Sequence, residues 1–361
     1  MYPLYSFKIL WQESIIIIEI LIKKNFHKKL RSKMPSAEIV KSIFTNDKKK
    51  RYYTSEGFII ETVSGQWARK IKKNYFLLNE AVRVTPGNYI LPSNYKNWHA
   101  RYQSFNVKPA DVFVVSFPKS GTTWTQEMVW CLLHNLDYEK AKVVLTKRFP
   151  YFEYEGMIPP KYLFMMPSLE KGDPNIPGES WKILNALPSP RTIKTHLFKE
   201  LLPVGIWSTK PKIVYVCRDP RDVCVSFFYH SMRYNGFRGE FSDFVELFLG
   251  DMLIMFTPYW KHVLDYWALR NEENILFIRY EELQQDISGM IQKVSAFLGK
   301  EITKDEVENL ANHLSFENMK NNKAVNNDNL IVFPLSKAKR VKFMRKGKVK
   351  SKNIFKRTKI F

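Results

Sequence analysis

The chain has 361 residues, 45% of them apolar, which is enough for a full core and excludes a disordered polyelectrolyte. Lysine and arginine number 57 against 35 aspartate and glutamate residues, giving a formal net charge of +22. The excess lies at the ends: residues 1–50 hold 11 basic and 4 acidic side chains, and residues 331–361 hold 12 basic and no acidic ones. A nucleic-acid binder usually carries its basic stripe within the folded body, so this distribution argues against a nucleic-acid partner.

The first 50 residues contain an apolar run, IIIIEILI, at residues 15–22. The stretch that starts near Phe7 is interrupted by charges, falls short of the ~20 apolar residues that span a bilayer, and precedes most of its positive charge. We therefore predict no signal peptide, no membrane anchor and no membrane partner, with a type II anchor as the alternative left open. We interpret residues 1–50 as a basic and apolar N-terminal extension that is non-native or disordered. Residues 1–33 would be an extra leader ahead of a second start at Met34.

The chain has three cysteines, and all of them lie in apolar stretches: Cys131, Cys217 and Cys224. No pair has the CxxC spacing, and no His-rich segment accompanies them, so nothing indicates zinc. We interpret them as reduced core thiols, which predicts a cytoplasmic protein. No metal site is predicted.

Residues 36–83 are charged and weakly periodic, and we expect peripheral structure there. The first strong strand is DVFVVSF at residues 111–117, an apolar run typical of a parallel strand buried on both faces. A tight loop and a helix from Trp124 follow, and further strands are predicted at 191–195, 212–217 and 274–280, with helices between them. This alternation predicts an α/β fold with a central parallel sheet flanked by helices.

The loop after the first strong strand reads FPKSGTTW at residues 117–124. A glycine between a buried strand and a helix lets the backbone approach an anion, and the helix start directs N–H groups and a favourable dipole at it. The candidate anion ligands are Lys119, Ser120, Gly121, Thr122 and Thr123. The pattern is not GxxxxGK[ST], which disfavours an ordinary ATP or GTP loop with Mg²⁺.

Two other places in the chain carry basic residues that could bind an anion. Arg218 comes directly after the strand KIVYVC, and Ser226 lies eight residues further along the chain. Ligands gather at the carboxyl ends of parallel strands, so both side chains can meet one anion there. A further basic pair beside a glycine, Arg345-Lys346-Gly347, stands near the C-terminus. Two anion sites indicate a nucleotide with two charged ends.

Five segments in this order resemble the cytosolic sulfotransferase family. They are FPKSGTTW at 117–124, TIKTH at 192–196, VCRDPRDVCVSFFYH at 216–230, RYEEL at 279–283 and FMRKGK at 343–348. The resemblance runs from about Leu91 to Lys348. It implies a single α/β domain related to nucleotide kinases, placed at residues 51–348, and the sulfuryl donor 3'-phosphoadenosine 5'-phosphosulfate, with no metal.

The resemblance also implies roles for individual residues. Residues 119–123 would hold the 5'-phosphosulfate, with Lys119 on the bridging oxygen, and Trp124 would stack on the adenine, which Tyr280 also approaches. The 3'-phosphate would be bound by Arg218 and Ser226, together with Arg345, Lys346 and Gly347. His196 corresponds to the catalytic base, with Lys194 beside it.

The chemistry independently suits these residue types. Transfer of a sulfuryl group to a hydroxyl needs a base for the acceptor's proton, and an imidazole supplies about 10²- to 10⁴-fold in rate. Charge that develops on the donor's oxygens needs fixed cations, a role that suits Lys119 and Lys194. The resemblance implies an acceptor pocket near Phe149, Tyr151 and Phe152, which suits a small lipophilic hydroxyl compound; plain core is the alternative for this cluster.

After Lys348 the sequence departs from the family pattern. The family continues with Gly-Asp-Trp-Lys and a closing segment that carries its dimer contact, whereas residues 349–361 form a basic tail. A homodimer stays open as a partner, although the family's usual dimer segment is not seen in this sequence. The altered C-terminus also leaves open whether the chain is fully active. Three alternatives stay open: a catalytically impaired binder of the nucleotide or a lipophile, a dehydratase of an allylic alcohol through a transient sulfate ester, and, weakest, a nucleotide kinase.

Overall fold

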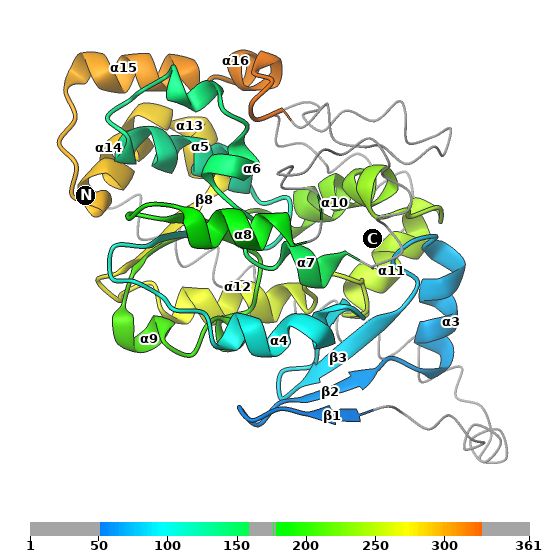
Figure 1. Cartoon of the computed structure of the whole chain (residues 1–361). Coiled ribbons are helices and arrows are strands. Elements are labelled where there is room, and N and C mark those ends of the chain that lie inside the picture. Colours follow the sequence, from blue (N-terminus) through cyan, green and yellow to red (C-terminus); the bar gives the residue numbers. More distant parts are fainter. Residues whose placement is uncertain (1–50, 159–175, 177, 327–361) are drawn as a thin grey trace, which may run out of the picture. The chain divides into compact units, whose positions relative to one another are not determined.

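The structure, a computed structural model, describes residues 51–158, 176 and 178–326 (Figure 1). A parallel sheet at its centre has the strand order β6-β5-β7-β8. Its strands are β5 (Val112–Val115), β6 (Thr192–Thr195), β7 (Lys212–Cys217) and β8 (Ile275–Arg279). All four lie within the segments expected to form strands, and the predicted α/β fold is confirmed.

Helices cover both faces of this sheet (Figure 1). Val214 and Val216 of β7 belong to a buried cluster with residues of α5 (Thr122–Leu133) and α14 (Ile287–Leu298). Tyr215, between them, stacks on Tyr266 of α12 (Tyr259–Ala268), with ring centroids 4.3 Å apart. Alternate residues of a strand point to opposite faces, so α5 and α14 cover one face and α12 the other. This two-sided burial explains the continuous apolar runs.

A second sheet, antiparallel in the order β1-β2-β3-β4, was not predicted. Its strands are β1 (Arg51–Tyr53), β2 (Ile59–Thr62), β3 (Ala81–Thr85) and β4 (Tyr89–Pro92). We expected only peripheral structure at residues 36–83, whereas this segment contains β1, β2 and the start of β3. Ile90 ties this sheet to the segment before α12, because its N–H donates to the Thr257 carbonyl at 2.8 Å and its carbonyl accepts from Phe256 at 3.0 Å.

The helix that follows β7 begins at residues suited to a helix N-terminus. α10 (Pro220–Tyr234) begins with proline at its first position, and the Asp219 carboxylate accepts from the Arg221 N–H at 2.9 Å. Among the described helices, none combines the length and the apolar character that a membrane span requires. The other helices and 3-10 turns are α3 (Gly65–Asn74), α4 (Tyr95–Gln103), η1 (Lys140–Lys142), α6 (Leu145–Arg148), α7 (Tyr154–Met157), α8 (Glu179–Ala186), η3 (Lys199–Leu201), α9 (Ile206–Thr209), α11 (Phe241–Leu249), α13 (Tyr280–Gln285), α15 (Lys304–His313) and α16 (Phe316–Asn321).

Candidate active site

The candidate residues lie along the carboxyl edge of the parallel sheet. The register pairs Val115 of β5 with Thr195 of β6 and with Tyr215 of β7, and Cys217 pairs with Arg279 of β8. The strands therefore end at the same edge, where ligands of open α/β sheets bind. The residues that directly follow these four strands are Ser116, His196, Arg218 and Tyr280.

The loop between β5 and α5 has a backbone shaped for close approach. Lys119 and Gly121 have φ values of 71° and 109°, in the left-handed region. A Cβ atom on Gly121 would lie 2.7 Å from Cδ2 of Tyr280, so only glycine fits there. Ser120 is buried, and among the described residues its hydroxyl has no hydrogen-bond partner. The loop leads directly into the first turn of α5, whose N–H groups have no partner within the helix.

His196 is buried at the end of β6, and its ring is fixed by the β5 loop. Its Nδ1 lies 2.7 Å from the carbonyl oxygen of Ser116. A carbonyl only accepts, so Nδ1 carries the proton and Nε2 carries the lone pair. The Ser116 hydroxyl, in turn, lies 2.6 Å from the Thr122 hydroxyl in the first turn of α5. The imidazole and the start of α5 therefore share one short network.

The electrostatic surroundings keep this imidazole neutral. Burial, followed by the positive charge of Lys194, lowers the pKa of His196 well below its ordinary value of 6.5. The accepting carbonyl of Ser116 acts in the opposite direction but is the weaker influence. The ring is therefore an unprotonated base at neutral pH.

Glu153, which sequence reasoning missed, lies beneath His196. This fully buried carboxylate accepts from the His196 backbone N–H at 2.6 Å and from the Thr195 hydroxyl at 2.7 Å. Burial raises the pKa of Glu153 and lowers that of Lys194, while the opposite charges of the two residues partly offset both shifts. Because Glu153 is brought to His196 only by the fold, the one available sequence signal was its place directly after the aromatic cluster.

A second group of candidates meets on the other side of the β5 loop. The Arg218 guanidinium carbon lies 4.1 Å from the ring centroid of Tyr280, and the rings of Tyr280 and Trp124 are 5.7 Å apart, edge to face. Arg218 is loosely held, at 3.4 Å from the Lys119 carbonyl and 3.8 Å from the Asp222 carboxylate. Among the described residues, Nε of Arg218 and Nε1 of Trp124 are buried without hydrogen-bond partners.

For the remaining predicted residues, the structure gives a position on a helix only, or they lie outside the described residues. Ser226 is a partly buried residue on α10, and its contact with a ligand stays a prediction. Thr123, in the first turn of α5, also remains a predicted anion ligand. Arg345, Lys346 and Gly347 lie outside the described residues.

The three predicted acceptor residues occupy different environments. Tyr151 approaches the candidate base, with its ring 5.4 Å from that of His196 and 4.1 Å from Nζ of Lys194. Phe149 belongs to the core cluster beneath α5, and Phe152 packs in an aromatic group with Trp181 at 5.7 Å. Sequence reasoning missed Phe256, whose ring lies 5.5 Å from that of His196. Two aromatic rings thus flank the imidazole.

Residues 109–359 match the family described as the sulfotransferase domain. Among curated proteins, luciferin sulfotransferase from Photinus pyralis is 42% identical over 255 residues, covering 70% of this chain and 68% of that protein. Sulfotransferase 1E1 from Homo sapiens is 34% identical over 248 residues, covering 68% of this chain and 78% of that protein.

Solved structures show the same fold. Retinol dehydratase in a complex with retinol and PAP superposes with a TM-score of 0.74 at 32% identity, covering 84% of this chain and 94% of that chain. Mouse sulfotransferase SULT7A1 complexed with PAP superposes with a TM-score of 0.54 at 26% identity, covering 76% and 89%.

Proposed function

The chain belongs to the sulfotransferase domain family, and on that premise we propose that it transfers the sulfuryl group of 3'-phosphoadenosine 5'-phosphosulfate to the hydroxyl of a small lipophilic acceptor by in-line displacement, with His196 as base. The observation that carries the proposal is Ser116, whose carbonyl orients His196 and whose hydroxyl contacts Thr122. A base and an anion-binding helix start are thereby held together.

The described residues fit this nucleotide. Within the described part of the chain, Ser120 has a buried hydroxyl without a partner, in the same loop where Gly121 leaves no room for a side chain. Arg218 and Trp124 likewise have buried N–H groups without partners within the described part of the chain. Unpaired buried donors are costly, and an anionic nucleotide would satisfy them. PAP bound in the solved relatives supports the same assignment.

Each group has a separate task in this account. The donor, when bound, supplies an activated sulfuryl group whose bond to the bridging oxygen breaks as the bond to the acceptor forms. Lys119, Ser120 and the first turn of α5 bind the 5'-phosphosulfate, and Lys119 and Lys194 offset the charge that develops on its oxygens. Nε2 of His196 takes the acceptor's proton. Arg218 binds the 3'-phosphate, and Trp124 and Tyr280 bind the adenine.

We assign the acceptor class from the rings around the base. Tyr151 and Phe256 flank His196, so an apolar ring or chain that carries the hydroxyl would pack between apolar surfaces. Phe149 and Phe152 would support these rings from behind, because Phe149 packs in the core cluster and Phe152 packs against Trp181.

Calorimetric titration with 3',5'-diphosphoadenosine, ADP and ATP, without added metal, tests the nucleotide part of the proposal. We expect micromolar or tighter binding that requires the 3'-phosphate. Equal binding of ADP, or a preference for ATP in a parallel titration with Mg²⁺, would contradict it and favour a kinase. Tight binding without turnover of any acceptor would identify the impaired binder.

A dehydratase is the second candidate, because retinol dehydratase is among the similar solved structures. The two reactions use the same site but leave different products. Mass analysis after reaction with an allylic alcohol separates them, since transfer leaves a stable sulfate ester and elimination leaves a dehydrated hydrocarbon with free sulfate.

A further inference from the structure

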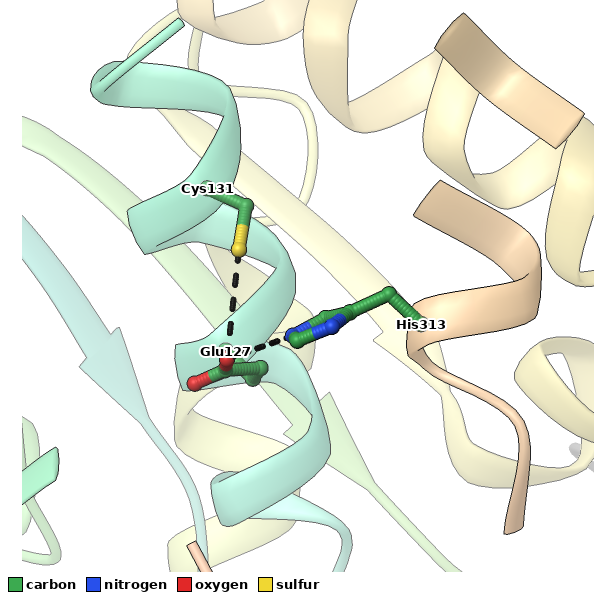
Figure 2. Close-up of side chains that lie close together, drawn as sticks. All are labelled: Glu127, Cys131 and His313. Carbon is green, nitrogen blue, oxygen red and sulfur yellow. Dashed lines mark hydrogen bonds and ion pairs between the residues drawn. The ribbon is translucent and has the colours of Figure 1, made fainter. Parts of the chain in front are cut away.

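Three side chains of types that bind metals lie close together beside α5. The proposed reaction uses none of them. Glu127 and Cys131 lie one turn apart on α5, and His313 ends α15 (Figure 2). A possible ligand atom of each lies within 4.8 Å of the others. Residues four apart share one face of a helix, so the pair on α5 faces the same side, where His313 meets it.

The contacts converge on one carboxylate oxygen. Nε2 of His313 lies 2.8 Å from Oε1 of Glu127, and Sγ of Cys131 lies 3.9 Å from the same atom. In a tetrahedral zinc site with bonds of about 2.0 to 2.3 Å, neighbouring ligand atoms are roughly 3.3 to 3.7 Å apart. These two distances therefore need to change by about half an ångström or less to match a zinc site, and the third, between the ligand atoms of His313 and Cys131, is within 4.8 Å.

The other oxygen of this carboxylate is already fixed. Oε2 of Glu127 lies 2.5 Å from Nη2 of Arg148. Arg148 is itself held, because its Nε donates to the Val143 carbonyl at 2.8 Å and its guanidinium lies 4.5 Å from the Trp130 ring. In metal sites, a ligating carboxylate is commonly oriented by a hydrogen bond to its other oxygen. Arg148 makes such a bond to Oε2 of Glu127, which leaves Oε1 facing Cys131 and His313.

We propose that Glu127, Cys131 and His313 bind one Zn²⁺, with water as the fourth ligand. One nitrogen, one sulfur and one carboxylate oxygen form a donor set that suits zinc and its spectroscopic substitute Co²⁺. On binding, Nε2 of the neutral His313 ring presents its lone pair after the ring proton moves to Nδ1. The Cys131 thiol loses its proton to solvent, as coordinated thiols do. Ion entry is possible beside His313, whose side chain is 20% exposed.

The expected role of this site is to join two helices. α5 begins at the phosphosulfate loop, and α15 lies far along the chain, since Glu127 and His313 are 186 residues apart. A ligand that binds only the folded state stabilises it by an amount that grows with the logarithm of its concentration relative to Kd. Zinc should therefore raise the melting temperature without being required for sulfuryl transfer. The sequence analysis predicted no metal from the spacing of the cysteines and did not identify this cluster. A Glu–Cys pair at helical spacing and a distant histidine form no contiguous motif.

The test is titration of the chelator-treated full chain with Co²⁺, read by absorption, and with Zn²⁺, read by calorimetry. We expect one equivalent with a thiolate-to-cobalt charge-transfer band. Cys131→Ser should abolish the band, and His313→Gln should weaken Zn²⁺ binding at least tenfold. Cys224→Ser, which removes a buried thiol elsewhere, is the matched control and should keep both.

Thermal melts of the same variants give an independent readout. Zn²⁺ should raise the melting temperature of the wild type and of Cys224→Ser, but not of Cys131→Ser. If no stoichiometric binding occurs, or if Cys131→Ser and His313→Gln bind as the wild type does, the proposal is wrong and the cluster is a metal-free hydrogen-bonded ion pair. Because His313 is at the helix end and partly exposed, its variant stays informative if Cys131→Ser folds poorly. None of these measurements requires the sulfuryl donor, so their failure leaves the proposed function untouched.

Discussion

Nδ1 of His196 lies 2.7 Å from the carbonyl oxygen of Ser116, the first residue after β5. This contact fixes both the ring and its tautomer, because the carbonyl requires a proton on Nδ1. It also joins the end of β6 to the loop that leads into α5. The proposed base at the end of β6 is thereby positioned by the loop that follows the neighbouring strand β5.

The tautomer and the lowered pKa of His196 can be measured directly. Burial disfavours the imidazolium, so we expect the neutral Nδ1–H form at pH 6.5, with protonation only as the pH falls well below that value. Because the neutral ring is the proposed base, its contribution to the rate should persist down to pH 6.5 and be lost only as the pH falls well below that value. Imidazole ¹⁵N NMR, assigned by comparison with His196→Ala, checks this. An imidazolium or an Nε2–H tautomer at pH 6.5 would contradict it.

Arg218→Ala tests the assignment of the 3'-phosphate site. Removing one partner of a buried charge pair costs about 2 to 5 kcal/mol, which corresponds to a loss of about 30- to 5000-fold in affinity for 3',5'-diphosphoadenosine. The affinity for ADP, which lacks that phosphate, should change little. Arg221→Ala is the matched control, because Arg221 pairs with Asp219 instead. If both nucleotides respond equally to Arg218→Ala, the residue does not bind the 3'-phosphate.

Gly121→Ala tests the shape of the phosphosulfate loop. Its φ of 109° disfavours any side chain, and the new methyl group would meet Tyr280. We expect a loss of about 1 to 3 kcal/mol in the free energy of unfolding and at least a tenfold loss of nucleotide affinity. Gly57→Ala is the control, because its φ is 86° and no described residue lies within 4 Å of the added atom. It should lose stability but keep its affinity; a Gly121→Ala protein with wild-type affinity would show that the loop does not bind the nucleotide.

Glu153 is proposed to position His196 without contacting the reactants. Glu153→Ala removes the acceptor for the His196 N–H and the Thr195 hydroxyl, so kcat should fall at least tenfold while the Kd for 3',5'-diphosphoadenosine changes little. Glu153→Gln keeps an acceptor oxygen for His196 and should restore part of kcat. Steady-state kinetics and calorimetry on both variants check this. Equal losses of kcat and nucleotide affinity in both would indicate a general structural defect instead.

Much of the sheet and its ligand edge could be predicted because the responsible residues are local. Strands buried on both faces leave apolar runs, and each run is followed directly by its candidate ligand, as Cys217 is by Arg218. The antiparallel sheet was missed because its strands are short and share no pattern: β1 has three exposed residues, and β4 has four buried residues that end in proline.

The long-range parts of the site could not be predicted in this way. Glu153 reaches His196 across 43 residues, and its role depends on the short parallel bridge between Tyr151 and Lys194. Within the predicted aromatic cluster, adjacent residues face different surroundings, so Tyr151 reaches the base while Phe149 enters the core. No local pattern distinguishes these two positions, since both are aromatic residues in one short segment.

The proposed reaction can be measured as sulfuryl transfer by the wild type and by His196→Ala. Both proteins would be given donor labelled with ³⁵S and a panel of phenols, steroid alcohols and retinoids, and labelled esters would be counted. We predict ester formation by the wild type and a loss of about 10²- to 10⁴-fold in His196→Ala, with nucleotide affinity within a few-fold. A wild type that binds the nucleotide but labels no acceptor, or a variant that is as active as the wild type, would contradict the account.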